Sequence, residues 1–97
     1  MAKEFTFGIT PGIEYLLDEF ENQFTLIHIQ NMLETAVEHF DKSNFISFKP
    51  NKLTTLVTDG NNNILQEIPL WIPQDIWMIK EESKTAIVIV AMLPREY

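Results

Sequence analysis

The chain has 97 residues, of which 45% are hydrophobic and 22% are charged, and its formal net charge is −7. This length and composition predict a single domain, residues 1–97, with a small hydrophobic core and no room for a second domain. The absence of cysteine excludes disulfides and thiolate metal sites, and the excess of acids argues against direct nucleic-acid binding, which needs clustered Lys and Arg.

Neither a secretory signal nor a membrane-spanning segment is predicted. The first residues, "MAKEFTFGIT", lack the basic and apolar regions of a signal peptide. The longest apolar run, "AIVIVAML", is far shorter than the roughly 20 residues that span a bilayer. We therefore expect a soluble cytoplasmic protein that makes no membrane contact.

Two helices are predicted in the first part of the chain, residues 10–41. Thr10 and Pro11 are typical of an N-cap and a first helical turn, and the apolar spacing that follows predicts a helix over about 11–21. Thr25 offers a second N-cap, for a helix over about 26–40. The two apolar stripes are Ile13, Leu16, Leu17 and Phe20, then Leu26, Ile29, Leu33, Ala36, Val37 and Phe40.

Short strands are predicted between residues 44 and 93, because β-branched and aromatic runs alternate there with turn residues. The runs are "NFISFKP", "KLTTLVTD", "NILQEIPL", "DIWMIK" and "KTAIVIVAML". "TDGNNN" and "KEESK" predict hairpins, and the final run, apolar on both faces, predicts a central strand. The predicted fold class is α+β, with two N-terminal helices packed on an antiparallel sheet of four to five strands.

The prolines at 69 and 73 bound a segment that predicts an edge or a loop, because proline cannot donate to a strand ladder. Trp71 lies inside this segment, where core and surface placements remain equally open. For Trp77 we expect the core, because a small domain needs large aromatic side chains to fill its volume.

The negative charge is concentrated near the N-terminus. Residues 1–41 contain eight acidic side chains against one lysine, whereas residues 42–97 contain six acidic and six basic ones. Acids recur at i, i+4 and i+7 on a flank of each predicted helix. Together with Glu19 they form the predicted partner-binding set: Glu14, Asp18, Glu19, Glu21, Glu34, Glu38 and Asp41.

Two interpretations of these acids stay open. They can be the solvated faces of two surface helices and serve only solubility, which is the usual explanation. Alternatively they can bind a basic partner, because like charges at i, i+4 cost a few tenths of a kcal/mol that ordinary helices avoid by interleaving lysine.

No catalytic or metal-binding constellation is recognisable. His28 and His39 are eleven residues apart, which on a continuous helix is roughly 16 Å, too far for one metal ion. We expect both to be solvated surface histidines. Phosphate-binding glycine loops, nucleophile elbows and calcium loops are also missing from the sequence. We therefore expect no enzyme activity, no cofactor and no metal.

Four segments together resemble a family of small, uncharacterised proteins carried by bacterial plasmids and phages: "ITPGIEYLLDEF", "TTLVTDGNNN", "IPLWIPQDIWM" and "AMLPREY". That family is similar in Thr-x-Gly-Val-x-Tyr-Leu near the start, Asp-Gly-Asn-Gly-Asn in a hairpin, and a terminal Leu-Pro-Ser-Glu-Tyr. The chain departs from it in Arg95, where the family usually has Ser, and in a compact segment before the first strand. The resemblance implies a mobile-element setting and contributes no site residues.

The predicted function is that of a small acidic interaction protein, not an enzyme. One form of it is a nucleic-acid-mimicking inhibitor that covers the basic surface of a host nucleic-acid-binding or defence protein. The alternative is an oligomerising accessory module in which strands and Trp71 form a symmetric contact, such as a homodimer, and the acids serve only solubility.

Overall fold

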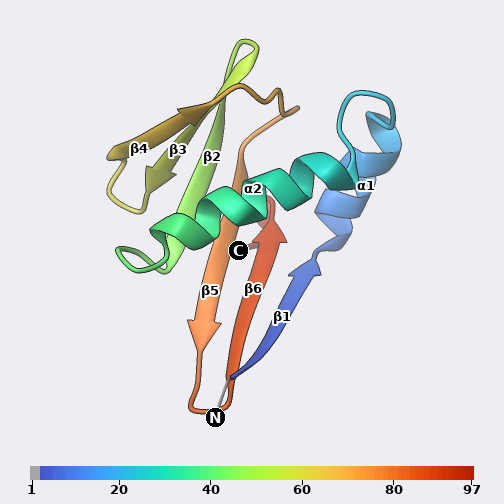
Figure 1. Ribbon diagram of the computed structural model, residues 1–97. Coiled ribbons are helices and arrows are strands. Elements are labelled where there is room, and N and C mark those ends of the chain that lie inside the picture. The colour runs from blue at the N-terminus through green and yellow to red at the C-terminus, as the bar shows by residue number, and fades with distance from the viewer. Residues whose placement is uncertain (1–2) are drawn as a thin grey trace.

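The computed structural model describes residues 3–97, and its first regular element is a strand (Figure 1). The order is β1 (Glu4–Ile9), α1 (Pro11–Glu19), α2 (Leu26–His39), β2 (Phe45–Asn51), β3 (Thr54–Asp59), β4 (Ile64–Ile68), β5 (Ile76–Glu82), β6 (Ala86–Met92) and a 3-10 turn (Pro94–Glu96). Both predicted helices and all five predicted strands are present, so the α+β class is confirmed.

The sheet differs from the prediction in strand number and direction. It has six strands in the order β1-β6-β5-β2-β3-β4, and β1 runs parallel to β6 while the other neighbours are antiparallel. The expectation of four to five antiparallel strands behind two leading helices was therefore wrong. A parallel partner cannot come from a hairpin, and here nearly the whole chain separates β1 from β6.

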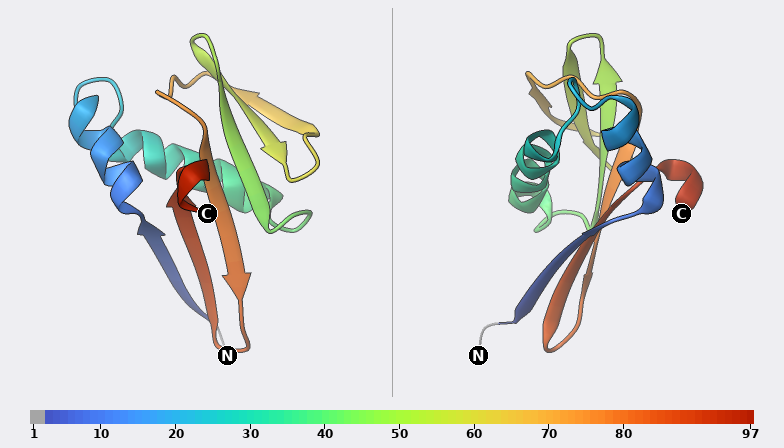
Figure 2. Two further views of the ribbon diagram at one scale, coloured as in Figure 1. Left: turned by 180° about the vertical axis from the view of Figure 1, so that it is seen from behind. Right: turned by 90° about the vertical axis from the view of Figure 1, so that its right-hand side faces the viewer.

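The two helices take different places around the sheet. In Figures 1 and 2, α2 lies across one face, whereas α1 stands at the end of β1 and β6, near the sheet edge. Thr10 caps α1 by accepting a hydrogen bond from the backbone N–H of Ile13 at 3.4 Å. Before α2, the backbone N–H of Thr25 donates to Nδ1 of His28 at 3.2 Å, so His28 caps a helix and is not simply solvated.

The core lies between α2 and the sheet. Strand alternation directs Ile76 and Met78 of β5 toward α2, and both are fully buried. Trp77 lies between them in sequence and points to the opposite face, so its predicted core placement was wrong. Trp71 packs against the core and meets Phe20 edge to face, with 5.8 Å between ring centroids. The largest fully buried side chains include Ile13, Phe24, Ile29, Met32, Phe48 and Ile89.

Within residues 3–97, no α-helix covers the middle of the opposite sheet face, and the C-terminal turn lies on that side (Figure 2). Five of its β5 and β6 side chains are apolar, half-buried and outside the core cluster, while Glu81 on the same face is exposed. The five are Trp77, Ile79, Val88, Val90 and Met92. We call this surface the open face.

A carboxylate at the end of the chain holds the start of α1. The Glu96 side chain accepts hydrogen bonds from Thr10 Oγ1 at 2.6 Å, from the backbone N–H of Gly12 at 3.0 Å and from that of Leu93 at 2.8 Å. The N-terminus of α1 thereby gains a negative charge where the helix dipole and its free N–H groups favour one. The segments "ITPG" and "LPREY", far apart in the sequence, are thus in direct contact.

This clamp predicts acid-sensitive stability. Burial raises the pKa of Glu96, but the hydrogen bonds from Thr10, Leu93 and Gly12 outweigh it and leave the pKa below the usual 4.5. Folding therefore favours the charged form. The stabilisation is complete above about pH 5 and is lost as the pH falls through the folded-state pKa. Urea unfolding at several pH values should show that wild type has a higher free energy of unfolding than Glu96→Gln near neutral pH and that this difference shrinks at acid pH. A difference that does not change with pH would contradict the assignment.

Candidate functional site

The acidic side chains predicted to bind a partner are all exposed. Within residues 3–97, ion pairs join Lys3 and Lys80 to Glu82, and none includes a member of the predicted set. A hydrogen bond and the charge of Lys3 lower the pKa of Glu82. The acids on the helices therefore have no ion-pair partner among the described lysines and arginine.

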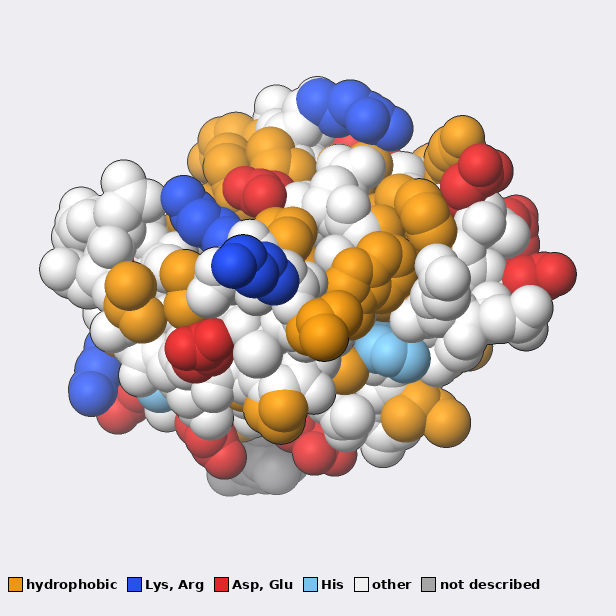
Figure 3. Space-filling view, turned by 90° about the horizontal axis from the view of Figure 1, so that it is seen from above, with side chains coloured by type: hydrophobic (Ala, Val, Ile, Leu, Met, Phe, Trp, Pro, Cys, Tyr) orange, Lys and Arg blue, Asp and Glu red, His pale blue; other side chains and the backbone are white. Residues whose placement is uncertain are grey.

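The two acidic ladders lie on helices that diverge from their connecting turn. In Figures 1 and 2, α1 and α2 meet at residues 20–25 and do not run side by side. Viewed from above in Figure 3, acidic side chains gather at the right edge, over α1 and this turn, apart from the basic side chains. Glu14 and Asp18 lie on α1, Glu19 and Glu21 border a shallow hollow at the turn, and Asp41 follows α2.

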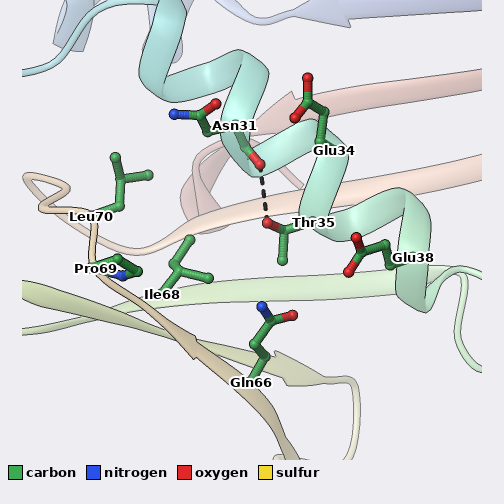
Figure 4. Close-up of a pocket in the computed structure, with 8 residues that line it drawn as sticks. All are labelled: Asn31, Glu34, Thr35, Glu38, Gln66, Ile68, Pro69 and Leu70. Atoms are coloured by element: carbon green, nitrogen blue, oxygen red, sulfur yellow. Dashed lines mark hydrogen bonds between the residues drawn. The ribbon is translucent and has the colours of Figure 1, made fainter.

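The structure brings Glu34 and Glu38 to a groove between α2 and β4 (Figure 4). The groove has a volume of about 290 Å³. In Figure 4, Glu38 extends toward it, and Glu34 stands farther from β4. The lining side chains are Asn31, Glu34, Thr35 and Glu38 from α2, and Gln66, Ile68, Pro69 and Leu70 from β4 and the following loop.

Hydrogen bonds hold the polar side chains in and beside this groove, and an apolar side chain lies at its base. Thr35 Oγ1 donates to the carbonyl of Asn31 at 3.1 Å, and His39 Nε2 is 3.0 Å from Gln66 Oε1, which ties the end of α2 to β4. His39 lies at the surface, half-buried, and its ring hydrogen-bonds a strand residue. Ile68 is buried at the base, where an aliphatic stem can pack, while carboxylates on the rim can accept hydrogen bonds from a cation.

No family model, curated protein or solved structure matches this chain.

Two further kinds of feature, a metal site and a membrane-spanning helix, are not found among the described residues. Among residues 3–97, no group of three or more His, Asp or Glu side chains is placed to hold a metal ion. Neither described helix is long and apolar enough to cross a membrane. What the groove offers is hydrogen-bond acceptors beside an apolar base.

Sequence reasoning missed the β4 side of the groove, Gln66 and Ile68 to Leu70. No local pattern could have indicated them, because their meeting with α2 depends on β4 taking the sheet edge beside β3. The acids themselves were found from helical spacing alone.

Proposed function

We propose that this is a small acidic interaction protein of a mobile element, without enzyme activity, that binds a basic surface of a host protein. The observation that carries the proposal is a set of seven exposed acids on and beside the helices, none paired with a cation within residues 3–97. Like charges at i, i+4 destabilise a helix unless opposite charge approaches. A basic partner would remove this cost.

The groove between α2 and β4 supports the same proposal. Glu38 and the amides of Asn31 and Gln66 surround a volume suited to one long side chain, and Ile68 gives its stem an apolar contact. Arg or Lys combines an apolar stem with a charged head, so either fits this mixture. The seven predicted acids would supply the surrounding negative field.

The specific form that we favour is mimicry of nucleic acid. A host protein that binds nucleic acid, including a defence effector, presents clustered Lys and Arg for phosphates. Exposed carboxylates along two helices would occupy that surface and block the natural ligand. The mobile-element setting in this proposal rests on the resemblance described above.

Capture from a host lysate at two salt concentrations tests the proposal. Exposed opposite charges attract weakly once salt screens them, so a basic partner should be retained at low salt and released at high salt. A bait with Glu34→Lys and Glu38→Lys, run in parallel, should retain much less of the same partner. Equal retention by both baits at both salt concentrations would contradict the proposal.

A second candidate is an oligomerising accessory module, favoured by the apolar open face. Trp71 does not contribute to that face, because it packs on the core side against Phe20. A symmetric contact would instead use the strands β5 and β6. Sedimentation analysis distinguishes the candidates, since a dimer held by apolar strands should persist at high salt, while a monomer at all salt concentrations favours the acidic interaction protein.

A further inference from the structure

The open face contains a second hollow, separate from the helices and from the acidic groove. Its volume is about 320 Å³, at the lower end of small-ligand sites. Strand alternation places Ser47 of β2 and Trp77 of β5 side by side on the face away from α2, and both line the hollow. It is completed by the β3–β4 turn and by Pro94.

One residue that lines this hollow, Ser47, carries a buried hydroxyl without a partner within residues 3–97. Ser47 is 2% exposed, and its Oγ makes no hydrogen bond within residues 3–97. Its cross-strand neighbour Thr58 is 3% exposed and has an unpartnered hydroxyl as well, but it does not line the hollow. A buried hydroxyl loses its hydrogen bonds to bulk water, so nearly all such groups in folded proteins have a partner, which can be a protein atom, a water or a ligand.

Two opposite charges line the same hollow, one position beyond the Phe48–Ile76 pair. Lys49 and Asp75 come directly after and before the paired residues Phe48 and Ile76, which places them opposite one another on adjacent strands. Within residues 3–97 they form no ion pair with each other, and the Asp75 side chain makes no hydrogen bond. Among the described residues, the only hydrogen bond of the Lys49 side chain is a long one, 3.4 Å to Asn62 Oδ1.

The other carboxylate at the hollow, that of Asp59, already accepts hydrogen bonds from the β3–β4 turn. Asp59 accepts hydrogen bonds from the backbone N–H groups of Asn61 at 2.8 Å and Asn63 at 3.0 Å, and from Asn63 Nδ2 at 3.0 Å. The hydrogen bond from the Asn63 side chain is the main reason that its pKa is lowered. This leaves one cation and one anion, Lys49 and Asp75, available to a ligand.

We propose that this hollow binds a free α-amino acid with an apolar side chain. The Lys49 ammonium would bind the ligand carboxylate, the Asp75 carboxylate would bind its ammonium group, and Ser47 Oγ would gain a hydrogen-bond partner. The aromatic rings of Phe45 and Trp77, 4.8 Å apart between centroids, would hold the apolar side chain. A ligand carrying both charges matches a site that carries both.

The test is an NMR titration of the ¹⁵N-labelled full chain with L-phenylalanine. We expect saturable shifts at residues 45–49 and 75–77, and binding weakened about tenfold or more for N-acetyl-L-phenylalanine and for L-phenylalanine amide, which each lack one charge. Equal shifts with all three compounds, or no saturable shift at about 10 mM, where a millimolar site would be largely occupied, would overturn the proposal.

Matched variants separate binding from folding. Lys49→Met and Asp75→Asn should each weaken binding about tenfold or more, whereas Lys84→Met, on the exposed β5–β6 hairpin, should leave it unchanged. Ser47→Ala should weaken binding while the protein remains folded, and Thr58→Val, which removes the hydroxyl outside the hollow, should not affect it. Full binding by either charge variant that remains folded would overturn the assignment, so the test still decides if the other variant fails to fold.

Discussion

Replacing Gly12 by alanine should lower the free energy of unfolding by about 1–3 kcal/mol, the usual cost of inserting a methyl group where no space exists. A Cβ at this position would lie 2.4 Å from Glu96 Oε1 and 2.8 Å from Leu93 Cδ1. The end of a glutamate can normally move aside, but here it holds three hydrogen bonds. Moving it breaks the clamp on α1. Urea unfolding would measure the loss of free energy. Thermal unfolding should show a Tm lower by about 4–8 °C per kcal/mol lost.

Two further variants test the cause of that loss. Gly8→Ala is the matched control, because a Cβ on Gly8 meets nothing within 4 Å, and it should be near neutral. In a Glu96→Ala background the Gly12→Ala change should cost much less, since the clashing carboxylate is gone and only Leu93 remains close. An equal cost in both backgrounds would mean that the Glu96 clamp does not explain the requirement for glycine.

Reversing four helix acids to lysine should abolish binding to the captured host partner. The changes are Glu14→Lys, Asp18→Lys, Glu34→Lys and Glu38→Lys, all at exposed positions. Because none of the four side chains has an ion pair or side-chain hydrogen bond within residues 3–97, the fold should be retained, which circular dichroism can verify. Association should fail because the surface facing the partner would then repel it.

The control for this variant changes charge elsewhere. Glu4→Lys with Glu81→Lys reverses two exposed acids on β1 and β5, away from both helices. This pair should leave most of the affinity intact, whereas Glu34→Lys with Glu38→Lys should remove most of it. Comparable losses from the two pairs would show that binding follows net charge and not a particular surface.

Local signals in the sequence were sufficient for most elements. Thr10 and Pro11 placed the start of α1, and the Asp59–Asn63 hairpin followed from its turn residues. β1 was missed although Phe5, Phe7 and Ile9 alternate as in a half-buried strand. Its parallel pairing with β6 had no local signal at all, because it arises from chain ends that meet only after folding.

The candidate site was predictable on its helical side only. Helical spacing identifies Glu34 and Glu38 as neighbours, and their exposure follows from the apolar stripe that α2 buries. The groove they border also needs β4 at the sheet edge, which spacing cannot reveal. The core placement predicted for Trp77 was wrong for a similar reason. Strand alternation predicts that successive β5 side chains face opposite sides of the sheet, but it does not predict which side α2 covers.

The most direct test measures, by calorimetry, how the dissociation constant for the purified partner depends on salt concentration. Two proteins are compared, wild type and the double variant Glu34→Gln plus Glu38→Gln. Our account predicts a steep rise in Kd with salt for wild type and a weaker, flatter dependence for the neutralised variant, because part of the screened attraction is gone. Identical affinities and slopes for the two proteins would contradict the claim that the acids on α2 form the binding surface.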